Sequence, residues 1–286
     1  MEAIKGSSWN AFLDLKFQQR GQVCRLVSSA HEGPLYVQKP FYPEGRDLAH
    51  VYLLHPPGGL VSGDSLRITI GLDALAKVLV TTPGASRIYR ARTDKRLQEQ
   101  YNVINVADGA SMEWLPQETI VYPGACGRLD TQVYLGQGSQ FSGWEITCLG
   151  LPASGQLFDR GEMQQRLLIM REGRPVLLEN LQFSDRTRAI YAAMVGLQSC
   201  PVTGIFVAGS FMPGELTDTL VDTLREIVAD SLREGIGGIS LLNGFIVGRY
   251  LGQCSGEARC LFIRLWAALR PALSGRQASL PGIWST

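Results

Sequence analysis

Acidic side chains beside short strand-like runs are the residues of this sequence best suited to do chemistry. They are Asp64, Glu113, Glu118, Glu145, Glu162 and Glu179. Two carboxylates that face each other across a β groove, one as general acid and the other as base or nucleophile, are the groups that most glycoside hydrolases use. A carbohydrate-active β-structured enzyme that uses paired carboxylates is therefore one hypothesis for this chain.

The stretch LLHPPGGLVSGD, residues 53–64, has the spacing of a phosphate-binding loop but not its chemistry. Gly58 and Gly63 are spaced as in a P-loop, but Asp64 stands where that loop has a lysine, and a carboxylate would repel phosphate. The following SLRITI alternates like a strand, so no helix N-terminus is available for an anion. The pattern favours a sharp turn between two strands, in which the glycines allow tight backbone turns and an acid is placed at the end.

Nucleophilic, metal and nucleic-acid sites have little support in the residues. Ser86, in GASRI, lacks the second glycine of a nucleophile elbow and does not precede a helical pattern. The six cysteines include no C-x-x-C pair, which argues against a disulfide framework and a structural zinc site. The net charge of +1 gives no general attraction to nucleic acid or an anionic membrane. We interpret the basic cluster between Arg87 and Arg96 as a solvated face.

The main body of the chain is predicted to be β. In the 286 residues, which are 45% hydrophobic, short runs alternate between apolar and polar residues and are bounded by Gly, Pro, Asp or Asn. Leu66, Ile68 and Ile70 alternate with polar neighbours in one such run. No linker or repeat interrupts the pattern, so residues 1–286 are expected to form a single domain. The chain has no apolar run of the roughly 20 residues that span a bilayer and no signal peptide, and we expect it in the cytoplasm.

Two amphipathic helices are predicted near the C-terminus. The first covers Pro213–Glu234, with proline at its first position and Gly235 just beyond its end. The second covers Ser255–Leu269, with Ser255 as its N-cap. Between the helices, a hairpin is expected with Asn243 and Gly244 at its turn.

Longer motifs occur in register from about Trp9 to Thr286. They are GPLYVQKPFYPEG, YLLHPPGGLVSGD, TTPGASRIYRA, EWLPQETIVYPGA, WEITCLG followed by SGQLFDRG, and the ending LWAALRPALSG with PGIWST. Taken together, they resemble the family of urease accessory proteins called UreD, or UreH in some organisms. Gly282 departs from the family pattern, which usually has arginine before Ile-Trp, so this chain lacks the side chain of that arginine.

The resemblance implies a fold and a role. Family members are mainly β, with many short strands in a helically coiled, β-helix-like architecture and two α-helices toward the C-terminus. They are not enzymes. They act with UreF and the GTPase UreG in a complex that docks on apo-urease and assembles its nickel centre, and UreG binds the nucleotide. By this resemblance the chain holds no permanent cofactor and contacts Ni²⁺ only transiently.

In the family, nickel is thought to move along an internal water-filled passage. Such a path needs weak oxygen ligands, because a cage of cysteine or histidine would retain Ni²⁺. By motif position, the metal candidates are Asp64, Glu145 and Glu179, with Ser86 and Glu118 as further polar residues of the path. Which of these side chains face inward is left open by the sequence.

Overall fold

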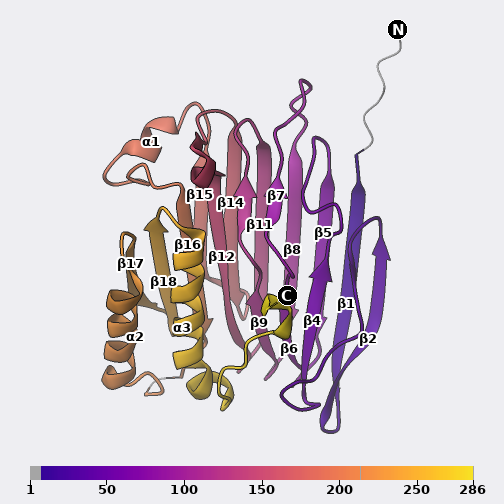
Figure 1. Cartoon of the computed structure of the whole chain (residues 1–286). Helices are drawn as coiled ribbons and strands as arrows, with labels where there is room; N and C mark the ends of the chain where they lie inside the picture. The colour runs from indigo at the N-terminus through magenta and orange to yellow at the C-terminus, as the bar shows by residue number, and fades with distance from the viewer. Residues whose placement is uncertain (1–7, 213, 286) are drawn as a thin grey trace.

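Two facing β-sheets form the body of the chain in the computed structural model, which describes residues 8–212 and 214–285 (Figure 1). In sheet order, the first sheet contains β15 (Arg174–Phe183), β14 (Glu162–Arg171), β11 (Cys126–Leu135), β8 (Gln98–Val106), β5 (Ser65–Leu72), β1 (Asn10–Arg20) and β2 (Val23–Glu32). The second contains β17 (Ile236–Leu242), β18 (Phe245–Gly252), β16 (Val202–Gly209), β12 (Gln140–Leu151), β9 (Ser111–Leu115), β6 (Lys77–Thr81), β4 (Leu48–Leu54) and β3 (Tyr36–Val37). Three short strands join it off this path, namely β7 (Ser86–Ile88), β10 (Thr119–Val121) and β13 (Gln156–Leu157).

The chain coils between the two sheets. From β4 to β14 it alternates between them, so that β5, β8, β11 and β14 are parallel neighbours in one sheet and β4, β6, β9 and β12 in the other. Antiparallel strands complete each sheet, as β2 and β15 do in the first. The sheets are mixed and open, and the predicted coiled, mainly β fold is confirmed.

Alternating side chains build the interior between the sheets. On β5, Leu66, Ile68 and Ile70 are buried, as the sequence pattern predicts. In the parallel pairing with β1, Leu13 lies beside Ile68 on the same buried face. This shared apolar interior joins the strands into one body, because strands such as β1 and β5 each bury one face in it.

The helices occupy the outer face of the second sheet. They are α2 (Asp218–Ser231) and α3 (Ser255–Ser274), and they form a second core with that face; α1 (Arg188–Ala192) and the 3₁₀ turns η1 (Pro152–Ser154) and η2 (Gly282–Ser285) are short (Figure 1). Trp144 on β12 lies 6.5 Å from Phe262 of α3, measured between ring centroids. No helix in the described part of the chain is long and apolar enough to cross a membrane.

Both long helices were predicted, but their ends differ. The predicted start at Pro213 lies outside the described residues. Thr217 caps α2 by accepting a hydrogen bond from Leu220, and the helix ends before Leu232, whose backbone is extended. Ser255 is not the N-cap of α3: Cys254 holds that position without a side-chain bond. The hairpin between β17 and β18 is confirmed, with positive φ at Asn243 and Gly244.

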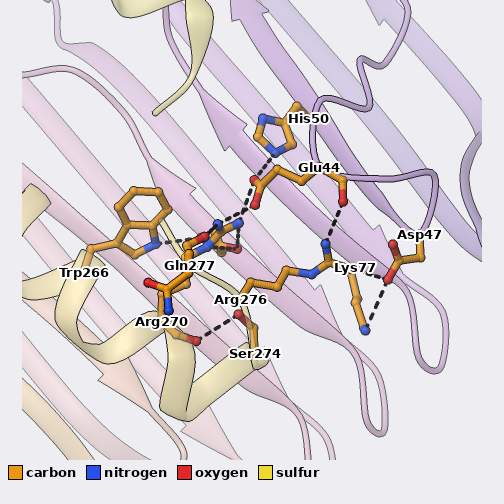
Figure 2. A network of polar contacts seen from close by, with 10 residues as sticks. Glu44, Asp47, His50, Lys77, Trp266, Arg270, Ser274, Arg276 and Gln277 are labelled. Carbon is orange, nitrogen blue, oxygen red and sulfur yellow. Dashed lines mark hydrogen bonds and ion pairs between the residues drawn. The ribbon is translucent and has the colours of Figure 1, made fainter. Parts of the chain in front are cut away.

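A buried charged network attaches α3 to the second sheet (Figure 2). Arg270, which is 2% exposed, pairs with Glu44 at 2.6 Å and with Glu113 of β9 at 3.0 Å. Trp266 Nε1 donates to Glu113 at 2.6 Å, and His50 Nε2 lies 2.8 Å from Glu44. The guanidinium therefore joins α3 to two carboxylates that are distant in sequence, one before β4 and one within β9.

Candidate functional site

Two cavities lie between the sheets, and they share the lining residues Glu145 of β12 and Gln165 of β14. The first has a volume of about 410 Å³ and reaches the exposed turn at Pro83 and Gly84. The second has a volume of about 530 Å³ and extends to β15, β17 and β18. Because the same two side chains line both cavities, the cavities adjoin there, and together they extend from the turn at Pro83 and Gly84 to β15, β17 and β18.

The alternation of side chains along β12 directs Glu145 toward these cavities. On β12, Trp144 and Ile146 point to the outer face and pack in the core beneath the helices. Phe141 and Leu149, on the opposite face, belong to the core between the sheets, and Glu145 shares their phase. A carboxyl group is thus placed in the interior between the sheets.

The surroundings of Glu145 favour its neutral form. Burial raises the pKa of Glu145, the charge of Asp130 acts in the same direction, and hydrogen bonds from Thr131 and Gln165 only partly oppose these effects. Gln165 Nε2 lies 2.6 Å from Glu145 Oε2. This carboxyl group therefore binds a proton more readily than an exposed glutamate does.

Polar side chains at core positions surround Glu145, and the sequence reasoning missed them. This interior polar stripe consists of Asn102 on β8, Thr131 on β11, Thr147 on β12 and Gln165 on β14, each at most 9% exposed. Asn102 donates to Thr131 at 2.9 Å and Thr147 to Gln165 at 2.5 Å. The alternation along β14 could have revealed Gln165, because this residue shares the inward-facing positions of Met163 and Leu167.

The glycine-rich turn positions Ser86 at the first cavity. Gly59 passes so close to β7 that a Cβ there would lie 2.6 Å from the carbonyl oxygen of Arg87, which explains the need for glycine. Leu60 N donates to that carbonyl at 2.8 Å, and Ser86 N donates to the Glu118 carbonyl at 2.9 Å. Ser86 and Arg87 both line the first cavity as a result.

Asp64 is held by backbone groups instead. Its Oδ1 accepts from Trp9 N and its Oδ2 from Val61 N, each at 2.8 Å, and the residue is 2% exposed. Asp64 does not line either of the two cavities. The carboxylate closes its own turn and fixes the start of β1 beside it.

We therefore expect Asp64→Ala to lower the free energy of unfolding by about 2–4 kcal/mol, because two buried N–H groups lose their acceptor. Asp64→Asn keeps one acceptor oxygen and is expected to lose less. Urea unfolding of the full chain measures both values. A change below about 0.5 kcal/mol for the alanine variant would contradict this role.

Glu179 and Glu118 occupy different positions. Glu179 on β15 lines the second cavity and pairs with Arg249 of β18 across the two sheets. Glu118 lines neither cavity, and its side chain lies 3.5 Å from the Ser255 hydroxyl at the start of α3. Of the five sequence candidates, the structure thus brings Ser86, Glu145 and Glu179 to the cavities.

The cavities offer single donor groups rather than a metal cage. Within residues 8–212 and 214–285, no group of three or more His, Cys, Asp and Glu side chains could hold a metal ion. His55 and Trp114 line the first cavity, and His55 Nε2 and Trp114 Nε1 are buried without a hydrogen-bond partner. Burial lowers the pKa of His55, with partial opposition from the Asp64 charge. Neutral imidazole and scattered oxygens suit brief contacts with a hydrated cation.

Comparison with known proteins gives a consistent result along the chain. The family model described as "UreD urease accessory protein" matches residues 10–285. The "Urease accessory protein UreD" of Marinomonas sp. is 47% identical, covering 99% of this chain and 92% of that protein. The protein of the same name from Azoarcus sp. is 41% identical over 97% of this chain and 94% of its own length. "Urease accessory protein UreD 2" of Brucella anthropi is 39% identical over 98% and 99%.

Proposed function

The chain belongs to the UreD family of urease accessory proteins, and from that membership we propose that it guides Ni²⁺ into apo-urease as part of a complex with UreF and the GTPase UreG. In this role it has no turnover of its own and holds no permanent cofactor. The nucleotide belongs to UreG, in agreement with the Asp64 turn, which lacks the lysine of a phosphate loop. The family match favours this role over the paired-carboxylate enzyme.

The observation that carries the proposal is the pair of adjoining cavities that share Glu145. A passage for a metal ion needs ligands that bind and then release it. Oxygen ligands placed singly meet this need, because a divalent first-row cation is held much more tightly by several nitrogen or sulfur ligands. Ser86, Glu145 and Glu179 are spread along the two cavities in this manner.

The raised pKa of Glu145 supports transfer rather than storage. A cation that binds the carboxylate must displace the proton that burial favours, and the proton returns when the cation leaves. The free energy of metal binding is reduced by the cost of this deprotonation. Glu145 would thus act as a low-affinity, transient ligand for the cation at the point where the cavities adjoin.

β15 and β17, which the second cavity reaches, lie with α1 toward one side of the molecule (Figure 1), and these elements carry the features of a partner surface. Large exposed apolar side chains occur on β15, β17 and around α1, namely Leu178, Ile190, Met194, Val195, Ile236, Leu241 and Leu242. Monomeric proteins seldom leave many such residues together unless a partner covers them. We assign this surface to UreF, which would extend the path beyond Glu179.

The proposal also places the chain in the cytoplasm. All six cysteines are free thiols. Free thiols persist in a reducing compartment, so this observation supports the assignment.

Deleting the gene from a urease-positive host tests the function. Apo-urease should accumulate without activity at limiting nickel, and the wild-type chain should restore both activity and bound nickel. Normal urease activity in the deletion strain would contradict the proposal.

The same strain tests the partner surface. Leu241→Glu places a charge on the exposed edge strand β17, where the residue is 53% exposed, and should reduce both co-purification of UreF and restored activity. Leu75→Glu is the matched control, since Leu75 is 62% exposed in the turn between β5 and β6, far along the sheet order. Equal UreF recovery with both variants would remove the assignment of this surface.

A further inference from the structure

Gln165 lies between the carboxyl group of Glu145 and the hydroxyl group of Thr147, at the point where the cavities adjoin. Its Nε2 donates to Glu145 Oε2 at 2.6 Å, and its Oε1 accepts from Thr147 Oγ1 at 2.5 Å. Gln165 is 9% exposed and Thr147 1% exposed, so both bonds are made away from bulk water. The orientation of the Gln165 amide therefore determines whether a cation bound at Glu145 faces the amide nitrogen or the amide oxygen.

The two partners of the amide differ in what they accept. Glu145 Oε2 accepts from the amide N–H₂ in the structure, and a carboxyl group keeps an oxygen that can accept this bond whether it is neutral or ionised. The hydroxyl of Thr147 can both donate and accept. If the amide of Gln165 turned over, Nε2 would donate to Thr147 and the bond on that side would be kept, although its direction would reverse.

A cation at Glu145 changes which orientation is favourable. In the present orientation, the positive end of the amide dipole points at the carboxylate and opposes a cation there. After the amide turns over, Oε1 faces the same point and adds a second oxygen ligand. The buried setting strengthens both effects, because electrostatic interactions are larger at low effective dielectric.

We propose that Gln165 is a switching oxygen ligand of the nickel path: when a divalent cation binds Glu145, the Gln165 amide turns over, coordinates the cation through Oε1 and transfers its N–H bond to Thr147. This inference rests on the proposed path through the cavities. After the cation leaves, the Nε2–Glu145 bond forms again. The reversal favours release, because the protein regains a bond that the cation had displaced.

The test uses purified complex at fixed concentration, with Ni²⁺ as the probe and two measurements. One is the rate at which apo-urease gains nickel, and the other is the nickel that the complex retains after gel filtration. Gln165→Met keeps a long side chain without the oxygen and should slow loading about tenfold, the size of effect that residues supporting a metal ligand produce. Gln165→Glu adds a permanent acidic oxygen and should raise the retained nickel while slowing delivery.

Two further variants separate switching from packing. Thr147→Val removes the hydroxyl that receives the amide and should slow loading with little change of shape. Gln164→Leu is the control on the same strand, because Gln164 bonds to Arg128 at 3.2 Å and does not line the cavities. It should load like wild type.

The outcomes separate this inference from the function on which it rests. Wild-type loading by Gln165→Met together with slow loading by Glu145→Gln would overturn the role of Gln165 and leave the path intact. Wild-type loading by both would overturn the path itself. Unchanged nickel retention by Gln165→Glu would also overturn the switching ligand, and this measurement does not depend on a loss that misfolding could produce.

Discussion

Glu145→Gln is expected to lower the rate of nickel delivery to apo-urease by at least about tenfold, while the chain still folds and joins its complex. The amide keeps the shape of the side chain and can bond to Gln165 and Thr131, but it offers no charge to a cation. Folding should be unimpaired, because burial already disfavours the ionised carboxylate and raises its pKa. The measurement is nickel per urease active site over time, at fixed concentration of purified complex.

Substitutions of other acidic residues serve as comparisons for the loading rate of Glu145→Gln. Glu162→Gln, an exposed acid at the start of β14, should leave loading unchanged. Glu179→Gln should have a smaller effect than Glu145→Gln, because Glu179 is 35% exposed and already paired with Arg249. Wild-type loading by the double variant Glu145→Gln, Glu179→Gln would rule out an acidic path through these positions.

Arg270→Met is expected to lower the free energy of unfolding by about 3–5 kcal/mol, the cost of leaving buried charges without their partner. Glu44 and Glu113 would remain buried with no guanidinium between them. Arg270→Lys should recover part of the loss, since one ammonium cannot reproduce the forked bonds to both carboxylates. Arg264→Met, on the exposed side of α3 with a 3.9 Å ion pair, is the control and should change stability by no more than about 0.5 kcal/mol.

The same network predicts a pH dependence. Burial alone would raise the pKa of Glu44, but hydrogen bonds from His50 and Arg270 outweigh it and lower the pKa to about 2. A carboxyl group with a depressed folded-state pKa contributes stability that is present above its ordinary value of 4.5 and is lost as the pH falls toward 2. The stability difference between wild type and Arg270→Met should therefore shrink below about pH 4.5. A difference that is below about 1 kcal/mol at pH 7, or that grows on acidification, would show that the network does not anchor α3.

Much of the fold follows from the sequence, because local physical rules act within each segment. The alternation of Leu66, Ile68 and Ile70 with polar residues predicts a half-buried strand wherever it pairs. Asn243 and Gly244 predict the hairpin, since both tolerate positive φ. Helix ends were less well determined. The backbone of α2 leaves the helical conformation at Leu232, and close by Glu257 of α3 accepts a bond from Arg233 N, a contact between segments distant in sequence.

The placement of the site was decided by tertiary structure. Periodicity shows that Glu145 and Trp144 face opposite ways, but only the packing of α3 on the Trp144 side determines that Glu145 faces the interior between the sheets. Asp64 and Glu145 are both acids within family motifs, yet two backbone N–H groups take the oxygens of Asp64, while Glu145 meets Gln165 from a strand in the other sheet. A sequence specifies which residues alternate along a strand. Which of them line a shared cavity depends on how the coiled sheets face each other, and that is a property of contacts between distant segments.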